Sequence, residues 1–324
     1  MAHALKPPPY VAPRWLRNPH LQTVYGSIVA AAPHPRLRRE RWETPDGDFV
    51  DVDFLDGPAG SPWVQLFHGL EGSSRSPYAR MLMAHAARRG WRGAVLNFRG
   101  CSGELNRLPR AYHSGDSDEA EWVLRRVKAL AGASPLHAVG ISLGGNVLAK
   151  WLGERGAAAR AVVDSAAAVS APLDLIAAAD ALERGLARMY AHHFLASLKR
   201  HALGKLARFP GLFEAHAVRR SATLRQFDDV VTAPLHGFRD AEDYYRRASA
   251  KPLLPGVAVP LLVLNARDDP FLPAQALPTE REVAPVVKLE FPSRGGHVGF
   301  VTGPFPGHIE WLPRRLLHFF EYRE

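Results

Sequence analysis

The stretch AVGISLGGNVL, residues 138–148, carries a GxSxG pattern at the point where an apolar run ends and a helix-forming run begins. Three fixed positions occur by chance in about one chain in ten of this length, so the neighbourhood of the pattern must decide its meaning. The run PLHAVGIS (135–142) predicts a buried strand, and LGGNVLAKWLGERG (143–156) predicts a helix. Ser142 is therefore expected at a strand-to-helix junction, which is where a nucleophile elbow holds its serine.

Other short apolar runs bounded by Gly or Pro also predict buried strands: 63–69, 92–100, 159–170, 259–267 and 286–293. Helical patterns at 78–90 and 116–132 separate the first of them. This alternation predicts an α/β fold with a mostly parallel central sheet and helices on both faces. The segments 38–47 and 48–55 meet at a Pro-Asp-Gly turn and predict an antiparallel hairpin at the edge, which brings the sheet to about eight strands.

The alternation stops between about 171 and 250, where the pattern is helical and rich in Ala, Arg and His. The strand pattern resumes at Val259. We expect this stretch to be a helical cap, or lid, inserted between two strands of one sheet. The chain 1–324 is then a single domain with a basic N-terminal arm over 1–36.

Charge and cysteine content narrow the function classes. Residues 1–41 hold seven Lys or Arg against Glu40 alone, which is +6 of the net +9. Contact with an anionic membrane surface through this arm is one expectation, whereas no nucleic-acid-binding signature accompanies the charge. No segment has the pattern of a signal peptide or a membrane span. The single cysteine, Cys101, is expected to be a small buried hydrophobe, and a cytoplasmic location is expected.

Two backbone amides are candidates for an oxyanion hole, a pair of N–H donors that stabilise a negatively charged oxygen. One belongs to Leu143, directly after the serine at the start of a helix. The other belongs to Leu70 in FHGLEGSS (67–74), because α/β-hydrolases place an amide donor in a turn of this kind after an early strand. His68 in the same turn is expected to have a structural role.

The acid and the base of a Ser-Asp-His triad are expected after the last two strands, in the order that α/β-hydrolases use. In LNARDDPFLP (264–273), Asp269 is favoured by its spacing to the final proline, and Asp268 stays open as the alternative. In SRGGHVGF (293–300), His297 follows two glycines and is placed to act as a general base. No motif for a metal or a cofactor is present, so neither is expected.

Beyond these positions, the chain resembles the YheT-like group of α/β-hydrolases over nearly its full length. The blocks that carry the resemblance are RNPHLQT (17–23), HGLEGSSRSPYAR (68–80), NFRGCSGELNR (97–107), YHSGD (112–116), GISLGGN (140–146), SAPLDL (170–175), FDDVVTAPLHGF (227–238), DYYRRAS (243–249), NARDDPF (265–271) and GGHVGF (295–300). The resemblance implies Ser142 as nucleophile, Asp269 as orienting acid and His297 as base. Ile141 stands where the family usually has Phe.

The expected function is that of a serine esterase or lipase-like enzyme that cleaves acyl esters through an acyl-enzyme. The resemblance, and not the residues, suggests short to medium acyl chains. One alternative is an acyltransferase that makes esters from acyl-CoA and an alcohol with the same triad. Another, of a different class, is a non-catalytic protein that binds lipid or protein.

Overall fold

The computed structural model describes residues 7–323, and its centre is one eight-stranded sheet with the strand order β1-β2-β4-β3-β5-β6-β7-β8. The strands are β1 (Arg38–Glu43), β2 (Phe49–Leu55), β3 (Trp63–Phe67), β4 (Arg92–Asn97), β5 (Leu136–Ile141), β6 (Ser165–Val169), β7 (Leu261–Leu264) and β8 (Val287–Glu290). From β4 to β8 all neighbours are parallel, whereas β1 and β2 pair antiparallel at one edge. The predicted fold class, strand number and edge hairpin are confirmed.

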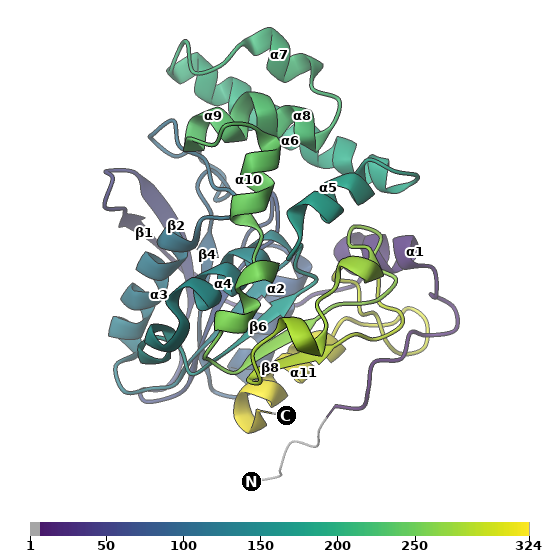
Figure 1. Cartoon of the computed structure of the whole chain (residues 1–324). Helices are drawn as coiled ribbons and strands as arrows, with labels where there is room; N and C mark the ends of the chain where they lie inside the picture. Colours follow the sequence, from purple (N-terminus) through teal and green to yellow (C-terminus); the bar gives the residue numbers. More distant parts are fainter. Residues whose placement is uncertain (1–6, 324) are drawn as a thin grey trace.

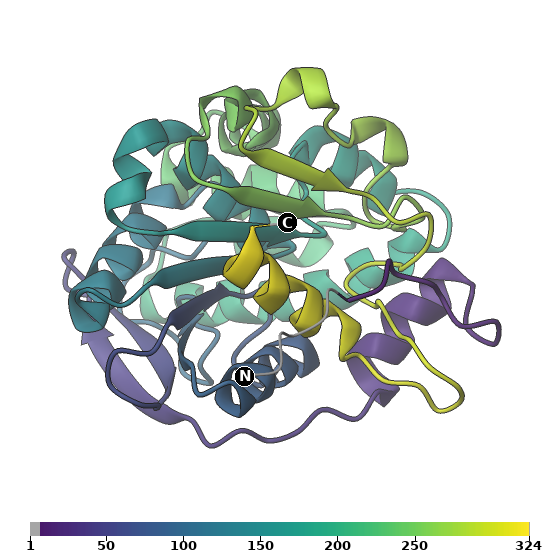
Figure 2. The ribbon, with the colours of Figure 1, turned by 90° about the horizontal axis from the view of Figure 1, so that it is seen from below.

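Helices cover both faces of the sheet, and Figure 2 shows α11 crossing one face. On that face α2 (Pro77–Arg88) and α11 (Trp311–Tyr322) pack over one set of strand side chains. On the other face lie α3 (Ser117–Ala131) and α4 (Leu143–Arg155), which share a second apolar core with the alternate strand residues. Burial on both faces explains why the central strands read as continuous apolar runs.

One predicted strand is shorter than expected. The run 159–170 begins with the end of a 3₁₀ helix, η2 (Gly156–Ala161), and β6 starts only at Ser165. Gly156, with φ of +50°, ends α4, and the chain must then turn back before it can pair with β5. Val162 and Val163 are buried in that turn, so their apolar character belongs to the connection and not to the sheet.

The helical lid rises above the sheet between β6 and β7 (Figure 1). Its elements are α5 (Leu175–Leu182), α6 (Ala187–Arg208), α7 (Ala215–Arg220), α8 (Leu224–Phe227), η3 (Asp228–Thr232), α9 (Ala233–His236) and α10 (Ala241–Ala248). Lys205 on α6 fixes the lid to the body, because its buried ammonium donates hydrogen bonds to Asn106 Oδ1 and to the Leu108 and Arg110 carbonyls at 2.7–2.8 Å. The chain returns to the sheet through η4 (Lys251–Gly256), and two short turns, η5 (Ala274–Ala276) and η6 (Glu280–Glu282), separate β7 from β8.

The N-terminal segment packs along the body of the protein. The Tyr10 hydroxyl donates to the Val301 carbonyl at 2.8 Å, and α1 (Pro19–Val24) continues into η1 (Tyr25–Val29) beside the lid. Of the predicted basic arm, residues 1–6 with Lys6 lie outside the described part. Within residues 7–323, no helix has both the length and the apolar character that crossing a membrane requires.

Candidate active site

Ser142 lies between β5 and α4 in a strained turn that only small neighbours permit. Its φ is +51°, which is rare for a residue with a side chain and is the strained backbone that a nucleophile elbow uses. A Cβ on Gly140 would come within 2.3 Å of the Gly144 carbonyl oxygen, and one on Gly144 within 2.4 Å of the Phe67 oxygen. The two glycines of GxSxG are therefore required by close backbone contact.

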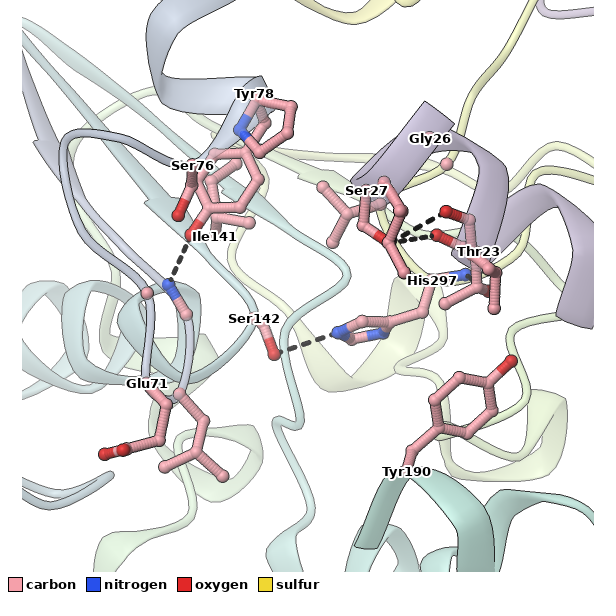
Figure 3. A pocket seen from close by; sticks show the side chains of 18 of the residues that line it. Thr23, Gly26, Ser27, Glu71, Ser76, Tyr78, Ile141, Ser142, Tyr190 and His297 are labelled. Atoms are coloured by element: carbon pink, nitrogen blue, oxygen red, sulfur yellow. Dashed lines mark hydrogen bonds between the residues drawn. The ribbon is translucent and has the colours of Figure 1, made fainter. Parts of the chain in front are cut away.

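The fold brings the three predicted triad residues together, and Figure 3 shows the His297 ring pointing at the Ser142 hydroxyl. His297 Nε2 lies 3.0 Å from Ser142 Oγ, and His297 Nδ1 lies 2.9 Å from Asp269 Oδ2. A carboxylate only accepts hydrogen bonds, so Nδ1 carries the proton and Nε2 is free to accept from the serine hydroxyl. This is the tautomer that a general base needs.

The two neighbouring aspartates have different partners. Asp269 is buried and its Oδ1 accepts a hydrogen bond from the Phe271 amide at 2.8 Å, which aims Oδ2 at His297. The Asp268 carboxylate instead accepts from the Gly296 amide at 3.0 Å. Burial raises the pKa of Asp268, and the nearby Asp269 charge adds to this. The geometry therefore favours Asp269 over Asp268 as the partner of the histidine.

Residues that the sequence did not single out hold the imidazole. The His297 amide donates to Thr23 Oγ1 on α1 at 2.9 Å, so the predicted arm supports the histidine loop directly. A Cβ on Gly296 would lie 2.5 Å from the Pro19 carbonyl oxygen, which shows how closely the two segments pack. The Phe271 ring stacks on the imidazole with centroids 4.1 Å apart. The block RNPHLQT was a signal only of family resemblance, since nothing in it predicts a contact with so distant a part of the chain.

The Leu70 loop lies against the serine. A Cβ on Gly69 would be 3.1 Å from Ser142 Cβ. Among the described residues, the Leu70 and Leu143 amides donate no hydrogen bond to another protein group. Both N–H groups are therefore available to a ligand oxygen beside Ser142.

His68 controls the direction of the Leu70 N–H, in agreement with a structural role. Its Nε2 accepts from the Phe98 amide at 3.1 Å, so Nδ1 carries the proton and donates to the Gly69 carbonyl at 2.7 Å. The Gly72 amide donates to the same carbonyl. Because a trans peptide points its C=O and N–H in opposite directions, fixing the Gly69 oxygen also fixes the Leu70 N–H. Burial lowers the pKa of His68 to about 4, which keeps it neutral.

Two apolar cavities meet at the serine. The larger, of about 720 Å³, runs between η1, the Leu70 loop, α6 and α11. The smaller, of about 130 Å³, lies inside the lid between α5, α8 and α10. The residues that line both are Leu70, Ser142, Phe194, Phe271 and His297. A molecule with two apolar portions, one in each cavity, joined by a group that lies beside Ser142, would fit this shape.

The remaining candidate residues are Cys101 and the histidines outside the triad. Within residues 7–323, no group of three or more His, Cys, Asp or Glu side chains is arranged to hold a metal ion. Cys101 is partly buried, and burial raises the pKa of its thiol. The sequence pattern predicted surface or lid positions for five histidines: His85, His192, His193, His201 and His216. The prediction is wrong for His85, which is buried on α2. Helix α2 packs against α11, and His85 lies on the covered part of α2.

A sheet of this order with a serine at a strained elbow defines an α/β-hydrolase, and the chain belongs to that family: residues 62–304 match the family model for the alpha/beta hydrolase fold. Within it, the chain belongs to the group of "Putative esterase YheT" of Escherichia coli, with which it is 42% identical over 315 residues, covering 95% of this chain and 91% of that protein. Phospholipase ABHD3 of Mus musculus is 30% identical over 94% of this chain and 76% of its own. The Pyrococcus furiosus esterase Pf2001 shares the fold, with a TM-score of 0.55 at 15% identity and 98% coverage of each chain.

Proposed function

We propose that the protein is a serine hydrolase that cleaves acyl esters with Ser142 as nucleophile, His297 as base and Asp269 as orienting acid. The protein's family and its relatives support an esterase- or lipase-like α/β-hydrolase. The observation that carries the proposal is the hydrogen-bonded chain from Asp269 through His297 to Ser142 Oγ. Beside it lie the Leu70 and Leu143 amides, which donate to no other group in the described part of the chain.

The reaction proceeds in two steps. His297 Nε2 removes the hydroxyl proton as Ser142 Oγ attacks the ester carbonyl, and the Leu70 and Leu143 amides donate to the developing oxyanion. The protonated imidazole, stabilised by Asp269, then gives its proton to the departing alcohol oxygen. Water, activated by the same His297, releases the acyl group and restores the serine.

The cavities support an apolar substrate of limited length. Leu175, Ala178 and Ala179 on α5 line the small lid cavity, and this cavity suits a short to medium acyl chain. The larger cavity would take the alcohol portion. Replacing Ala179 by Phe should shift the preferred p-nitrophenyl ester to shorter chains in a series from two to sixteen carbons. An unchanged optimum would mean that the acyl chain lies elsewhere.

An acyltransferase uses the same triad, and only the acceptor differs. Incubating the protein with acyl-CoA and ethanol and measuring ethyl ester against free acid separates the two reactions. Excess ester would favour transfer, whereas free acid would favour hydrolysis. The third alternative, a non-catalytic lipid- or protein-binding member, predicts neither product.

Part of the positive charge counted over residues 1–41 is not available for contact with a membrane, because some of its arginines lie on β1, beyond the arm. Arg39 and Arg41 form ion pairs with Asp53 and Asp51 on β2, at 2.8 and 2.9 Å, and so do not face a lipid surface as free cations. Exposed apolar side chains instead border the large cavity, with Ile28 78% and Met189 70% exposed. We propose this rim as the membrane-facing part. Vesicles of anionic phospholipid should bind the wild type, and exchange of Ile28 and Met189 for Ser should weaken that binding.

A further inference from the structure

Glu71, directly after the proposed oxyanion residue Leu70, has an unusual backbone. Its φ is +55°, a left-handed conformation that is strained for a residue with a side chain. The Glu71 amide donates to the Tyr112 hydroxyl at 2.8 Å. The position is held against this strain by contacts of both its backbone and its side chain.

The Glu71 carboxylate joins the loop to the lid. The Tyr112 hydroxyl donates to Oε1 at 2.9 Å. On α6, the Ser197 hydroxyl donates to Oε2, and His201 Nδ1 lies 3.2 Å from the same oxygen. Ser197 and His201 are four residues apart and therefore share one face of the helix. One carboxylate thus receives donors from the body and from the lid.

The carboxylate is kept ionised in a place where water hardly reaches it. Its side chain is only 10% exposed. Burial alone would raise the pKa of Glu71, but the contacts with His201, Ser197 and Tyr112 outweigh burial and lower it. The contact is therefore a set of charge-assisted hydrogen bonds, which are about twice as strong as neutral ones.

Both sides of Leu70 are consequently fixed by different parts of the molecule. His68 and the Gly72 amide hold the Gly69 carbonyl before it, whereas Tyr112 and the carboxylate of Glu71 hold the chain after it. Only the second set reaches the lid. A shift of α6 would release two of the donors to Glu71 and loosen the segment that presents the Leu70 N–H.

We propose that Glu71 is a positioning residue that couples the seating of lid helix α6 to the orientation of the Leu70 amide. With α6 in place, both oxyanion donors face the reacting carbonyl, and with α6 displaced only Leu143 is held. This inference rests on the proposed hydrolase function, since it assigns Leu70 a share of that reaction.

A double-mutant cycle tests the coupling with p-nitrophenyl butyrate as substrate. Glu71→Ala should lower kcat by about 10- to 100-fold with KM changed less than about two-fold, because one oxyanion donor becomes poorly aimed. Glu71→Gln should retain more activity, since its amide oxygen still accepts a hydrogen bond. The lid pair Ser197→Ala with His201→Asn should also lower kcat. Adding Glu71→Ala to that pair should lower it no further than Glu71→Ala alone.

The matched control is His192→Asn, on the same helix, whose Nδ1 is hydrogen-bonded to the Arg188 carbonyl of its own turn. It should leave kcat unchanged. Independent effects of the loop and lid changes would overturn the coupling, as would a rise in KM at constant kcat, which is what a mere wall of the cavity predicts. Inhibition by a trifluoromethyl ketone should weaken in parallel with kcat, because its adduct places an oxyanion on the same amides.

A second measurement does not depend on activity. Amide hydrogen exchange over 68–76 should speed up in the Ser197→Ala, His201→Asn protein, whose changes lie on the partly exposed lid and leave the core intact. Unchanged exchange there would contradict the coupling even if the wild type hydrolysed no ester. Faster exchange without any ester hydrolysis would instead keep the coupling and remove the proposed function.

Discussion

At the scale of single residues, the choice between Asp268 and Asp269 shows how local geometry assigns chemistry. Both carboxylates follow β7, and sequence spacing favours one without excluding the other. In the folded chain, Asp269 contacts the imidazole of His297, whereas Asp268 accepts from the backbone amide of Gly296, the residue before that histidine. The two side chains therefore make a matched pair for mutation.

Asp269→Asn should lower kcat by about 10⁴-fold, because the amide favours the wrong tautomer of His297 and no longer stabilises its charged form. Asp268→Asn should lower it far less, since that residue holds only the loop. Steady-state kinetics on an activated ester measures both. A larger loss in Asp268→Asn would transfer the role of orienting acid to that residue.

At the scale of elements, the lid depends on a few buried polar contacts as well as on apolar packing. The Lys205 ammonium on α6 satisfies three acceptors in the loop 106–110. On the other side, Asn146 of α4 donates to the Ser114 and Ala248 carbonyls and accepts from the Ala250 amide, which fixes the end of the lid. These contacts position α6 and α10 over the serine.

Lys205→Met should destabilise the protein by about 1–3 kcal/mol, because Asn106 Oδ1 loses its charged donor. The Leu108 and Arg110 carbonyls lose one donor each but still accept from Asn106 Nδ2. Urea unfolding measures the change, and amide exchange over 187–208 should increase. Lys199→Met on the same helix is the control, since its ammonium donates to the Arg219 carbonyl at an exposed position. Equal effects of the two variants would show that Lys205 has no special part in seating the lid.

The elements were largely predictable from sequence, and their contacts were not. Apolar runs bounded by Gly and Pro predicted the parallel strands because both faces of the sheet are buried, although β6 was predicted too long where Val162 and Val163 are buried in a turn. Strand ends also indicated Ser142, Asp269 and His297. The support from Thr23 and the link from Glu71 to α6 depend on packing between distant segments, which no local pattern encodes. The catalytic roles, the domain boundaries and the cytoplasmic location stay predictions.

At the scale of the whole molecule, buried histidines make stability depend on pH. Burial is the main cause that lowers the pKa of five of them to between about 3 and 4: His68, His85, His113, His137 and His236. The unfolded chain binds protons at these groups below about pH 6.5 and the folded protein does not. Their contribution to stability is therefore complete above pH 6.5 and is lost as pH falls toward 4.

The free energy of unfolding should fall between pH 7 and pH 5. Glu119 and Asp228 act in the opposite direction, because burial raises their pKa values to about 7 and about 6, but two carboxyls do not offset five histidines. Urea titrations at several pH values measure the slope. His137→Gln, between Trp91 and Phe320 and away from the serine, should reduce that slope by about one proton. A slope unchanged by this variant would contradict a neutral buried His137.

The central claim is that Ser142 is the nucleophile, and covalent labelling tests it most directly. The folded wild-type protein, treated with a fluorophosphonate and digested, should carry one adduct on the peptide that contains Ser142. Ser142→Ala should carry none and should lose hydrolysis of p-nitrophenyl butyrate. An adduct on another residue, or a folded protein that neither reacts with the probe nor hydrolyses the ester, would contradict the claim.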